Sequence, residues 1–547
     1  MTDRRRQVGR VLPAVLALVV GTGLLAGCSS DPEGPTTSPP APGKLRVLAG
    51  SELADLQPVL DRAARDTGVK VEFTFTGTIE GAEALARGDA DKAYDAVWFS
   101  SNRYPQALPD AARRLGNQTK IMSSPVVLGL AKSKAGSLGW AGKPVTWTDI
   151  AKAAEAKRFS YGMTDPSASN SGFSALVGVA SALAGTGAAV NADQVKTVTP
   201  ELKKFFAAQS MSAGSSGWLS DAYQRRAAGT DPGQKIDGLV NYESVLLSLN
   251  ASGKLPEPLT LIYPTDGVVT ADYPLTLLSN ASDHARNDHQ RLGDFLKAPD
   301  VQREIMALTH RRPGQPGVAL AAEFGTQPMV ELPFPATQEA FDALLSAYFD
   351  QIRKPSRTVY VLDVSGSMND DDRIGSLRTA LVGLTGASDD LVGRYRRFHG
   401  REEVTFIPFN GAPQAPRSFT VPETDPKAEL ERIKSTVTGL EASGGTAIYD
   451  SLERAYQVIA SQPAEDRFTS IVLMTDGANT SGTGYDDFQR AQAGRSPQLR
   501  GVPVFPVLFG EGDQTEMEGL AAQTGGKVFD ARKAGLQQVF REIRGYQ

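Results

Sequence analysis

Short apolar runs that end in polar loops alternate with amphipathic helical stretches in two separate parts of this 547-residue chain. Strands that alternate with helices are typical of parallel sheets, because a crossover between parallel strands is usually a helix. The expected strands cover residues 45–49, 69–75, 94–99, 125–131 and 259–263 in the first part, and 358–362, 403–408, 469–474 and 503–509 in the second. Among the helical stretches, residues 237–243 are expected to open one helix and residues 294–309 to form another. The pattern predicts two α/β modules whose sheets carry helices on both faces.

The loop that follows the run 358–362 has the spacing of a cation site. It reads Asp-Val-Ser-Gly-Ser, so one carboxylate and two hydroxyls lie within five residues. Oxygen ligands suit a hard divalent cation, and neutral hydroxyls leave the metal most of its charge, which favours an anionic ligand from outside the protein. Two further oxygen donors lie in loops of the same module, and ligands bind at the carboxyl ends of strands in such sheets. The predicted metal ligands are Asp363, Ser365, Ser367, Thr446 and Asp476.

All five positions resemble the metal-ion-dependent adhesion site of von Willebrand factor A (VWA) domains. The resemblance covers Thr358 to about Arg544 and implies a Rossmann-like fold with a mostly parallel sheet. It implies that Ser365 and Ser367 coordinate Mg²⁺ (or Mn²⁺ or Ca²⁺) directly, while Asp363 and Asp476 often act through water or hydrogen bonds. An Asp or Glu of a partner protein would then fill the open position. The adjacent Asp370 and Asp371 resemble a second cation site of integrin β chains, but they equally suit a solvated acidic turn before a helix.

The first module resembles the two-lobed, type 2 periplasmic solute-binding proteins that bind sulfate, molybdate and related ligands. The resemblance rests on the Gly50-Ser51 turn, the polar loop 165–172 and the segment 241–243. It implies a cleft for a small solute between two lobes, with chain crossings near 123–125 and 263–267. Hydroxyl and amide side chains at strand ends and helix starts can hold an anion, although the same residues also favour helix caps. The candidate contacts are Ser51, Thr78, Ser100, Ser101, Asn170, Ser171 and Tyr242.

The N-terminus predicts export and lipid anchoring. Four arginines precede the apolar stretch 11–27, and Leu25 to Cys28 resembles a bacterial lipobox, which implies lipidation of Cys28, the only cysteine in the chain. The expected organisation is a signal peptide over 1–27, a lipidated Cys28 and Pro-rich stalk over 28–43 and a solute-binding-like domain over 44–335. A bridging helical segment over 336–357 and a VWA domain over 358–547 follow. The expected location is extracytoplasmic, on the membrane.

Composition and motifs argue against an enzyme and against a nucleic-acid partner. The formal net charge is −5, so no basic surface is expected, and the sequence lacks the nucleophile-elbow, Walker A, dinucleotide-binding and zinc-protease motifs. The pair His284 and His289 is read as a solvated turn because no further zinc ligands accompany it. Two hypotheses follow: cation-dependent binding of an acidic group on a partner protein, for adhesion or complex assembly, or an ABC-transporter receptor for a small anion with an accessory VWA domain.

Overall fold

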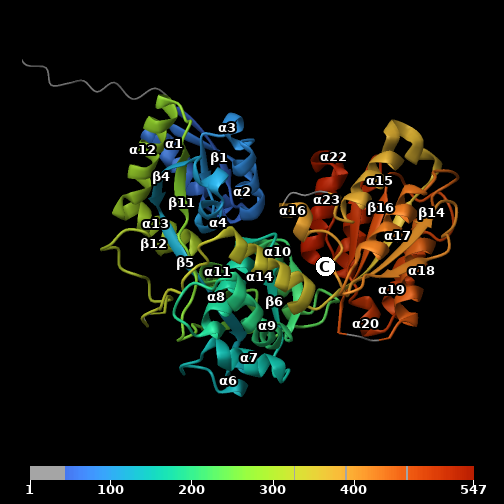
Figure 1. Cartoon of the computed structure of the whole chain (residues 1–547), viewed down its shortest axis with the longest axis horizontal. Coiled ribbons are helices and arrows are strands. Elements are labelled where there is room, and N and C mark those ends of the chain that lie inside the picture. The colour runs from blue at the N-terminus through green and yellow to red at the C-terminus, as the bar shows by residue number, and fades with distance from the viewer. Residues whose placement is uncertain (1–42, 326, 388–390, 464–465) are drawn as a thin grey trace, which may run out of the picture. The chain divides into compact units, whose positions relative to one another are not determined.

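Three sheets flanked by helices account for the residues described by this computed structural model (Figure 1). The described residues are 43–325, 327–387, 391–463 and 466–547. The predicted signal peptide over 1–27, the lipidation site Cys28 and all but the last residue of the stalk lie outside them. Those expectations therefore stay predictions.

The first sheet has the strand order β2-β1-β3-β11-β4, with β11 antiparallel to its neighbours. Its strands are β1 (Gly43–Ala49), β2 (Val69–Phe75), β3 (Ala96–Trp98), β4 (Leu115–Lys120) and β11 (Pro274–Leu278). Its helices are α1 (Gln57–Thr67), α2 (Thr78–Arg87), α3 (Ala90–Ala93), α4 (Arg103–Ala107), α5 (Pro109–Ala112), α12 (Asp283–Lys297) and α13 (Pro299–Thr309). A 3₁₀ turn over Ser51–Leu56 precedes α1.

The second sheet has the order β10-β5-β8-β6-β7, and β9 and β12 also pair with β5. Its strands are β5 (Met122–Ala131), β6 (Tyr161–Thr164), β7 (Gln209–Ala213), β8 (Gly238–Tyr242), β9 (Leu259–Ile262), β10 (Thr270–Ala271) and β12 (Arg312–Pro313). Its helices are α6 (Lys132–Leu138), α7 (Trp147–Glu155), α8 (Asn170–Ala184), α9 (Ala192–Phe206), α10 (Ser216–Ala228) and α11 (Glu243–Ala251). The chain leaves the first sheet between β4 and β5 and returns between β10 and β11.

Four local expectations differ from the structure. The return crossing lies at Asp272 and Tyr273 and not at 263–267, because β10 still pairs with β5. The segment 237–243, read as the opening of a helix, is mostly strand β8; all five of its residues are buried, so no alternation marks it. The helix expected over 294–309 is two helices, since Pro299 starts α13. His284 and His289 lie on α12 and not in a turn, and buried His289 Nε2 lies 3.2 Å from the carbonyl of Leu275.

The expected amphipathic helix before the last module is α14 (Gln338–Ala347), which continues as a π-helical turn over Tyr348–Ile352. Its apolar stripe packs into the solute-binding module. The Phe341 ring meets Tyr104 of α4 edge-on at 5.2 Å and lies 5.4 Å from Phe173 of α8. Because α4 flanks the first sheet and α8 the second, this aromatic cluster ties both lobes to the segment that leads to the last module.

The third sheet has the order β15-β14-β13-β16-β17-β18, in which only β15 is antiparallel to its neighbour. Its strands are β13 (Ser356–Asp363), β14 (Glu403–Phe409), β15 (Arg417–Thr420), β16 (Phe468–Thr475), β17 (Val504–Leu508) and β18 (Phe529–Asp530). Apolar side chains alternate between its faces: Tyr360 and Leu362 of β13 belong to one core cluster, and Val359 and Val361 to another.

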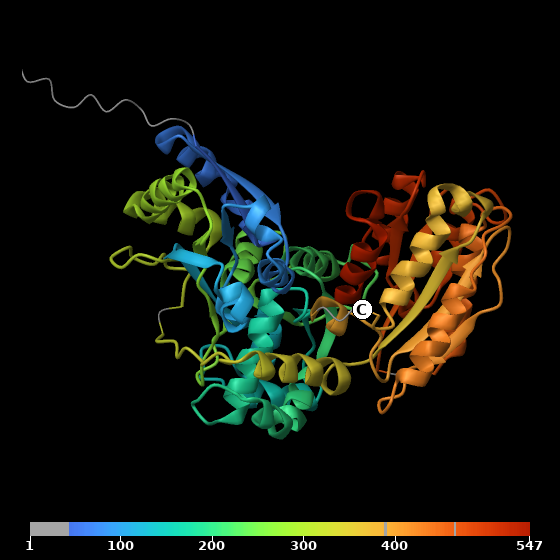
Figure 2. The same cartoon turned by 45° about the horizontal axis from the view of Figure 1, so that its top comes forward.

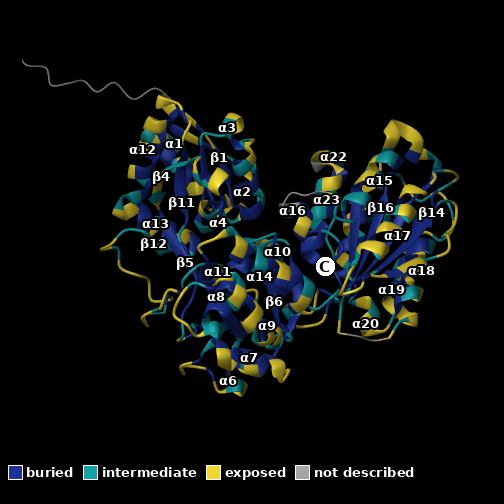
Figure 3. Cartoon of the chain, in the orientation of Figure 1, coloured by how far each residue is buried: buried dark blue, intermediate teal, exposed yellow. Residues whose placement is uncertain are grey.

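Helices cover both faces of this sheet (Figures 1 and 2). Side chains of α15, α17 and α23 join Tyr360 and Leu362, while those of α18, α19 and α21 join Val359 and Val361. The helices are α15 (Arg373–Gly383), α16 (Leu391–Tyr395), α17 (Lys427–Thr438), α18 (Ile448–Ser461), α19 (Tyr485–Gly494), α20 (Pro497–Arg500), α21 (Gln514–Thr524), α22 (Ala531–Ala534) and α23 (Leu536–Ile543). Burial follows this layering: the strands are buried, and the helices are exposed on their outer faces (Figure 3).

None of the helices in the described ranges combines the length and the apolar character that crossing a membrane requires.

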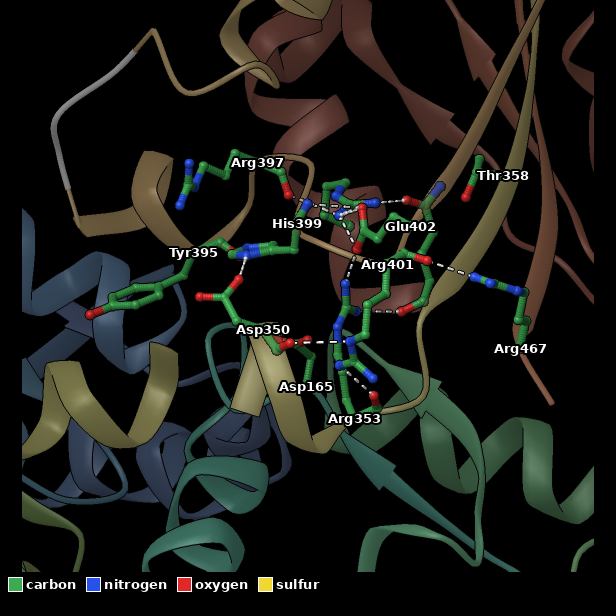
Figure 4. Close-up of polar contacts among 12 residues, drawn as sticks. Asp165, Asp350, Arg353, Thr358, Tyr395, Arg397, His399, Arg401, Glu402 and Arg467 are labelled. Atoms are coloured by element: carbon green, nitrogen blue, oxygen red, sulfur yellow. Dashed lines mark hydrogen bonds and ion pairs between the residues drawn. The ribbon is translucent and has the colours of Figure 1, made fainter. Parts of the chain in front are cut away.

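A buried carboxylate joins the bridging segment to the last module (Figure 4). Glu402 is 1% exposed and pairs with two buried guanidinium groups, Arg353 at the end of the π-helical turn and Arg544 near the C-terminus. Arg544 Nη2 donates to both Glu402 oxygens at 2.7 and 2.6 Å. Arg353 Nη1 also donates to the backbone carbonyl of Gln547 at 3.1 Å. The network therefore fixes the chain end against the first turn after α14.

The pKa of Glu402 follows from this environment. Burial alone would raise the pKa, but the charges of Arg544 and Arg353 outweigh burial and lower it. A carboxyl whose folded-state pKa is lowered stabilises the fold at neutral pH, and that contribution disappears only as the pH falls through the lowered folded-state pKa.

Replacing Glu402 by Gln should therefore destabilise the last module strongly. Two buried guanidinium groups would lose their counter-charge, and breaking a buried pair in this way costs about 3–5 kcal/mol. Chemical denaturation of the wild-type and variant chains measures the loss. The control is Glu431→Gln on α17, whose exposed carboxylate lies 3.4 Å from Lys434 and should change stability by less than about 0.5 kcal/mol. Equal effects of the two variants would contradict the assigned role.

Candidate functional site

The predicted metal ligands gather where the strand order of the third sheet reverses. In the order β15-β14-β13-β16-β17-β18, the chain winds outward in opposite directions from β13 and from β16. A crevice forms outside the carboxyl ends of strands at such a switch point. Asp363 is the last residue of β13, and Asp476 directly follows β16. The topology thus brings together two carboxylates that are more than a hundred residues apart.

Hydrogen bonds within the loop after β13 orient its oxygens. The carboxylate of buried Asp363 accepts from the Ser365 backbone N–H at 2.8 Å on one oxygen, and its other oxygen lies 2.8 Å from the Thr475 hydroxyl. Burial raises the pKa of Asp363, although the hydrogen bonds from Ser365 and Thr475 oppose the shift. Asp363 therefore anchors the loop, and each of its oxygens makes a hydrogen bond within the protein.

Three oxygens of the predicted set have the separations that a small cation needs. Ser365 Oγ lies 3.0 Å from Ser367 Oγ, and Ser367 Oγ lies 2.9 Å from Asp476 Oδ1. With Mg–O distances of about 2.1 Å, neighbouring oxygens of an octahedron lie about 3.0 Å apart. Ser367 is exposed whereas Ser365 and Asp476 are buried, so the set opens toward solvent on one side. These residues fit a Mg²⁺-sized ion with an open outer position.

The loop that carries Thr446 lies against the same site. Gly366 N–H donates to the Gly444 carbonyl at 2.9 Å, and Ser443 N–H donates to the Val364 carbonyl at 2.8 Å. Thr446 itself is held by its backbone, which donates to Thr480 Oγ1 at 2.9 Å and accepts from the Thr480 N–H at 2.8 Å. The three loops predicted to contribute ligands are therefore neighbours in the structure.

Two residues of this site were not anticipated from the sequence. Thr475, the last residue of β16, supplies the hydroxyl beside Asp363, and Arg373, the first residue of α15, donates to Asp476 Oδ2 at 2.9 Å. The hydrogen bond and charge of Asp476 raise the pKa of Arg373. Sequence spacing offered no signal for either, because each is recognised only by its distance from a carboxylate in another loop. Asp476 thus presents one oxygen to Ser367 and the other to the Arg373 guanidinium.

The acidic turn 370–372 forms no second cluster of ligands. Asp370, Asp371 and Asp372 are exposed, and Asp371 lies 3.7 Å from the Arg373 guanidinium. Within the described ranges, no group of three or more His, Cys, Asp or Glu side chains is arranged to hold a metal ion. A solvated turn therefore accounts for the placement of Asp370 and Asp371. The candidate metal site is the set of oxygens around Ser365 and Ser367.

A cavity of about 350 Å³ lies over the carboxyl ends of β1 and β3 and the start of α8. Four of the seven predicted cleft residues line it, namely Ser51, Thr78, Ser100 and Asn170. The other three are not among the lining residues. Tyr242 Oη accepts from Asn170 Nδ2 at 3.0 Å, the Ser171 hydroxyl lies 2.7 Å from that of Ser216, and Ser101 Oγ accepts from the Arg103 N–H at 3.3 Å. Their contact with a solute stays a prediction for all seven.

The cavity also has lining residues that the sequence interpretation did not include. Glu52 and Glu80 come from the first lobe, and a further set comes from the last module: Arg396, Lys527, Gln538, Glu542 and Tyr546. Burial raises the pKa of Glu52. The contribution of the last module has no sequence signal, since nothing in a strand–helix pattern tells which surfaces of two modules meet.

Comparison with known families assigns both modules. Residues 45–307 match the family described as bacterial extracellular solute-binding protein, and residues 359–542 match the von Willebrand factor type A domain. The chain therefore carries a solute-binding domain followed by a VWA domain, which confirms the predicted α/β fold class. A bacterial extracellular solute-binding domain implies an extracytoplasmic location.

Individual relatives are distant or partial. Inter-alpha-trypsin inhibitor heavy chain H4 of Homo sapiens is 31% identical over 133 residues, which are 23% of this chain and 13% of that protein. The periplasmic binding protein AfuA from Actinobacillus pleuropneumoniae is 12% identical, with a TM-score of 0.43 over 57% of this chain and 98% of its own. The von Willebrand factor type A structure from Catenulispora acidiphila is 20% identical, with a TM-score of 0.28 over 35% of this chain and 42% of its own.

The backbone beside Asp476 should tolerate little change. Gly510 has φ +112°, and an added Cβ would lie 2.7 Å from the Asp476 carbonyl oxygen and 3.0 Å from its Cβ. Gly510→Ala should therefore lower the free energy of unfolding by about 1–3 kcal/mol through backbone strain and displacement of Asp476. Gly477→Ala, next to Asp476 but with open space around the added Cβ, is the control. Chemical denaturation that finds the two variants equally stable would refute this assignment.

Proposed function

We propose that this chain is an extracytoplasmic binding protein, not an enzyme, whose VWA domain uses a divalent cation to bind an acidic group of a partner protein. The cation, Mg²⁺ or another divalent ion that prefers oxygen ligands, would be held by Asp363, Ser365, Ser367, Thr446 and Asp476. The observation that carries the proposal is the 2.9–3.0 Å spacing of three of their oxygens at an exposed switch point. The bound ion would supply positive charge to attract a carboxylate.

The chain's own residues prepare that interaction. Asp363 and Thr475 hold the loop so that Ser365 and Ser367 present neutral hydroxyls, and neutral ligands leave more of the ion's charge for the partner. Adhesion and assembly of a membrane complex use the same chemistry and differ only in the partner. Anchoring through Cys28, which the sequence predicts, would place this site outside the cytoplasmic membrane.

Divalent cations should stabilise the chain, and Asp363→Ala should abolish the effect. A ligand that binds only the folded state raises its stability by mass action, and removal of Asp363 unfastens the loop that carries both serines. Thermal unfolding with Mg²⁺, Mn²⁺, Ca²⁺ or EDTA measures the shift. The matched control is Asp372→Ala, which removes an exposed carboxylate from the same loop. A shift of the same size in Asp363→Ala, or none in the wild type, would count against the proposal.

Arg373 should weaken cation binding, since its guanidinium already pairs with Asp476 at 2.9 Å. Arg373→Gln removes one positive charge next to the ligand set and should increase Mg²⁺ affinity by about tenfold, or about 1.4 kcal/mol. Isothermal titration gives the affinity. Arg378→Gln is the control on the same helix, because Arg378 donates to the Leu440 carbonyl and not to a carboxylate. Unchanged or weaker Mg²⁺ binding in Arg373→Gln would show that Arg373 does not compete with the ion.

A second candidate function is that of a receptor that delivers a small anion to an ABC transporter. The cavity over β1, β3 and α8 favours it, because about 350 Å³ is within the range of small-molecule sites. Binding of a small anion by the whole chain in the presence of EDTA would support this function, since EDTA disables the proposed cation site.

A further inference from the structure

The cavity of the solute-binding domain is completed by the VWA domain. Fifteen of its lining residues lie between Gly50 and Ser216, and not one of these is Lys or Arg. The two basic residues of the lining, Arg396 and Lys527, both come from the VWA domain. Lys527 belongs to the loop before β18, and Arg396 directly follows α16. A cleft that would otherwise have only acidic charges thus acquires its positive charge from the other domain.

Contacts around the cavity hold the VWA domain at its wall. Gln538 Nε2 of α23 donates to Glu80 Oε1 of α2 at 2.7 Å, and the Ser212 hydroxyl of β7 donates to the Gly545 carbonyl at 3.2 Å. The Tyr546 ring meets Trp218 of α10 edge-on at 5.0 Å. These contacts involve both lobes of the solute-binding domain, because α2 flanks the first sheet and β7 and α10 belong to the second.

Three helices begin at the cavity. Gly77 and Thr78 start α2, Ser169 and Asn170 start α8, and Ser215 and Ser216 start α10. The caps of α2 and α8 make no side-chain hydrogen bond to the first turn, so the helix N–H groups there are left for another acceptor. Helix N-termini carry partial positive charge and favour anions.

Arg396 supplies a second, independent sign of a ligand. Its side chain is 5% exposed and lines the cavity. Nη2 donates to the Ser167 carbonyl at 3.3 Å, but Nε has no hydrogen-bond partner among the residues that the structure describes. A buried guanidinium N–H without a partner is costly, and the charge of an anion bound against the same guanidinium would offset that cost.

Three acidic residues, Glu52, Glu80 and Glu542, share the lining with Arg396 and Lys527. Glu80 accepts from Gln538, and Glu542 accepts from Lys527 Nζ at 2.7 Å, while Lys527 also donates to Tyr546 Oη at 3.0 Å. Burial raises the pKa of Glu52, which favours its neutral form, although the nearby Arg311 charge opposes the shift. Lys527 is therefore largely compensated by Glu542, while Arg396 has no ion pair among the residues that the structure describes.

We infer that the cavity is a composite site for a small solute with a phosphate or sulfate group. The helix starts of both lobes and the VWA residues Arg396 and Lys527 bind that group together. This inference rests on the second candidate function and deepens it, because an anion held in this way would link the solute-binding domain to the VWA domain.

The test is calorimetric titration of the whole chain in EDTA with inorganic phosphate, sulfate and glucose 6-phosphate. The first two report on a free oxyanion, and the third on an esterified one. Arg396→Gln and Lys527→Gln should each weaken binding of the oxyanion by at least about tenfold, and Arg396→Lys should weaken it less than Arg396→Gln because it retains the charge. Lys533→Gln, at an exposed lysine of α22, is the control and should leave affinity within about twofold.

The outcomes separate the composite site from the receptor function. Wild-type binding that persists with equal affinity in both Gln variants would overturn the composite site and leave the receptor function standing. Absence of binding of all three anions to the wild type would overturn both. A loss of affinity in Arg396→Gln together with an unchanged thermal unfolding midpoint would support the composite site, since misfolding would lower the midpoint.

Discussion

The buried pairing of Glu402 with Arg353 and Arg544 determines how the end of this chain is placed. Arg353 ends the π-helical turn after α14, whose aromatic residues pack on both lobes, and Arg544 lies at the end of α23. Arg353 and Arg544 also bind Gln547 through its carbonyl and its side chain. Three buried charges are stable only in an arrangement in which each is paired, so the pairing holds the last turn of the chain in one position. Tyr546 and Glu542 reach the solute cavity as a result.

Both domains place their candidate sites by the same rule of α/β architecture. In the VWA domain the loops after β13 and β16 meet at the reversal of strand order, and in the solute-binding domain the loops after β1 and β3 meet at the cavity. The chemistry then diverges. Hydroxyls with two carboxylates suit a cation in the first case, and helix N-termini with borrowed guanidinium and ammonium groups suit an anion in the second.

The parts of the fold with strong local patterns could be predicted, and those that depend on distant partners could not. The strand 358–362 and the loop after it were evident, since an apolar run ending in Asp-x-Ser-x-Ser has few other interpretations. Strand β8 was not, because it is buried on both sides and carries no alternation. The break between α12 and α13 was missed although Pro299, which starts α13, marks it locally. Edge strand β15 is short and mostly exposed, with only Phe419 buried, so little in its sequence distinguishes it from a loop.

The sequence by itself determined the two-module α/β architecture and predicted the oxygen-rich loops around Asp363, because periodicity and short motifs are local and the topology of parallel sheets brings strand ends together. Only the tertiary structure decided which residues surround those loops. Arg373 and Thr475 meet the two carboxylates through folding of separate loops, and Arg396 and Lys527 reach the solute cavity through packing of one domain on another. Such contacts depend on complementary surfaces and buried charge pairs, which leave no periodic signal along the chain.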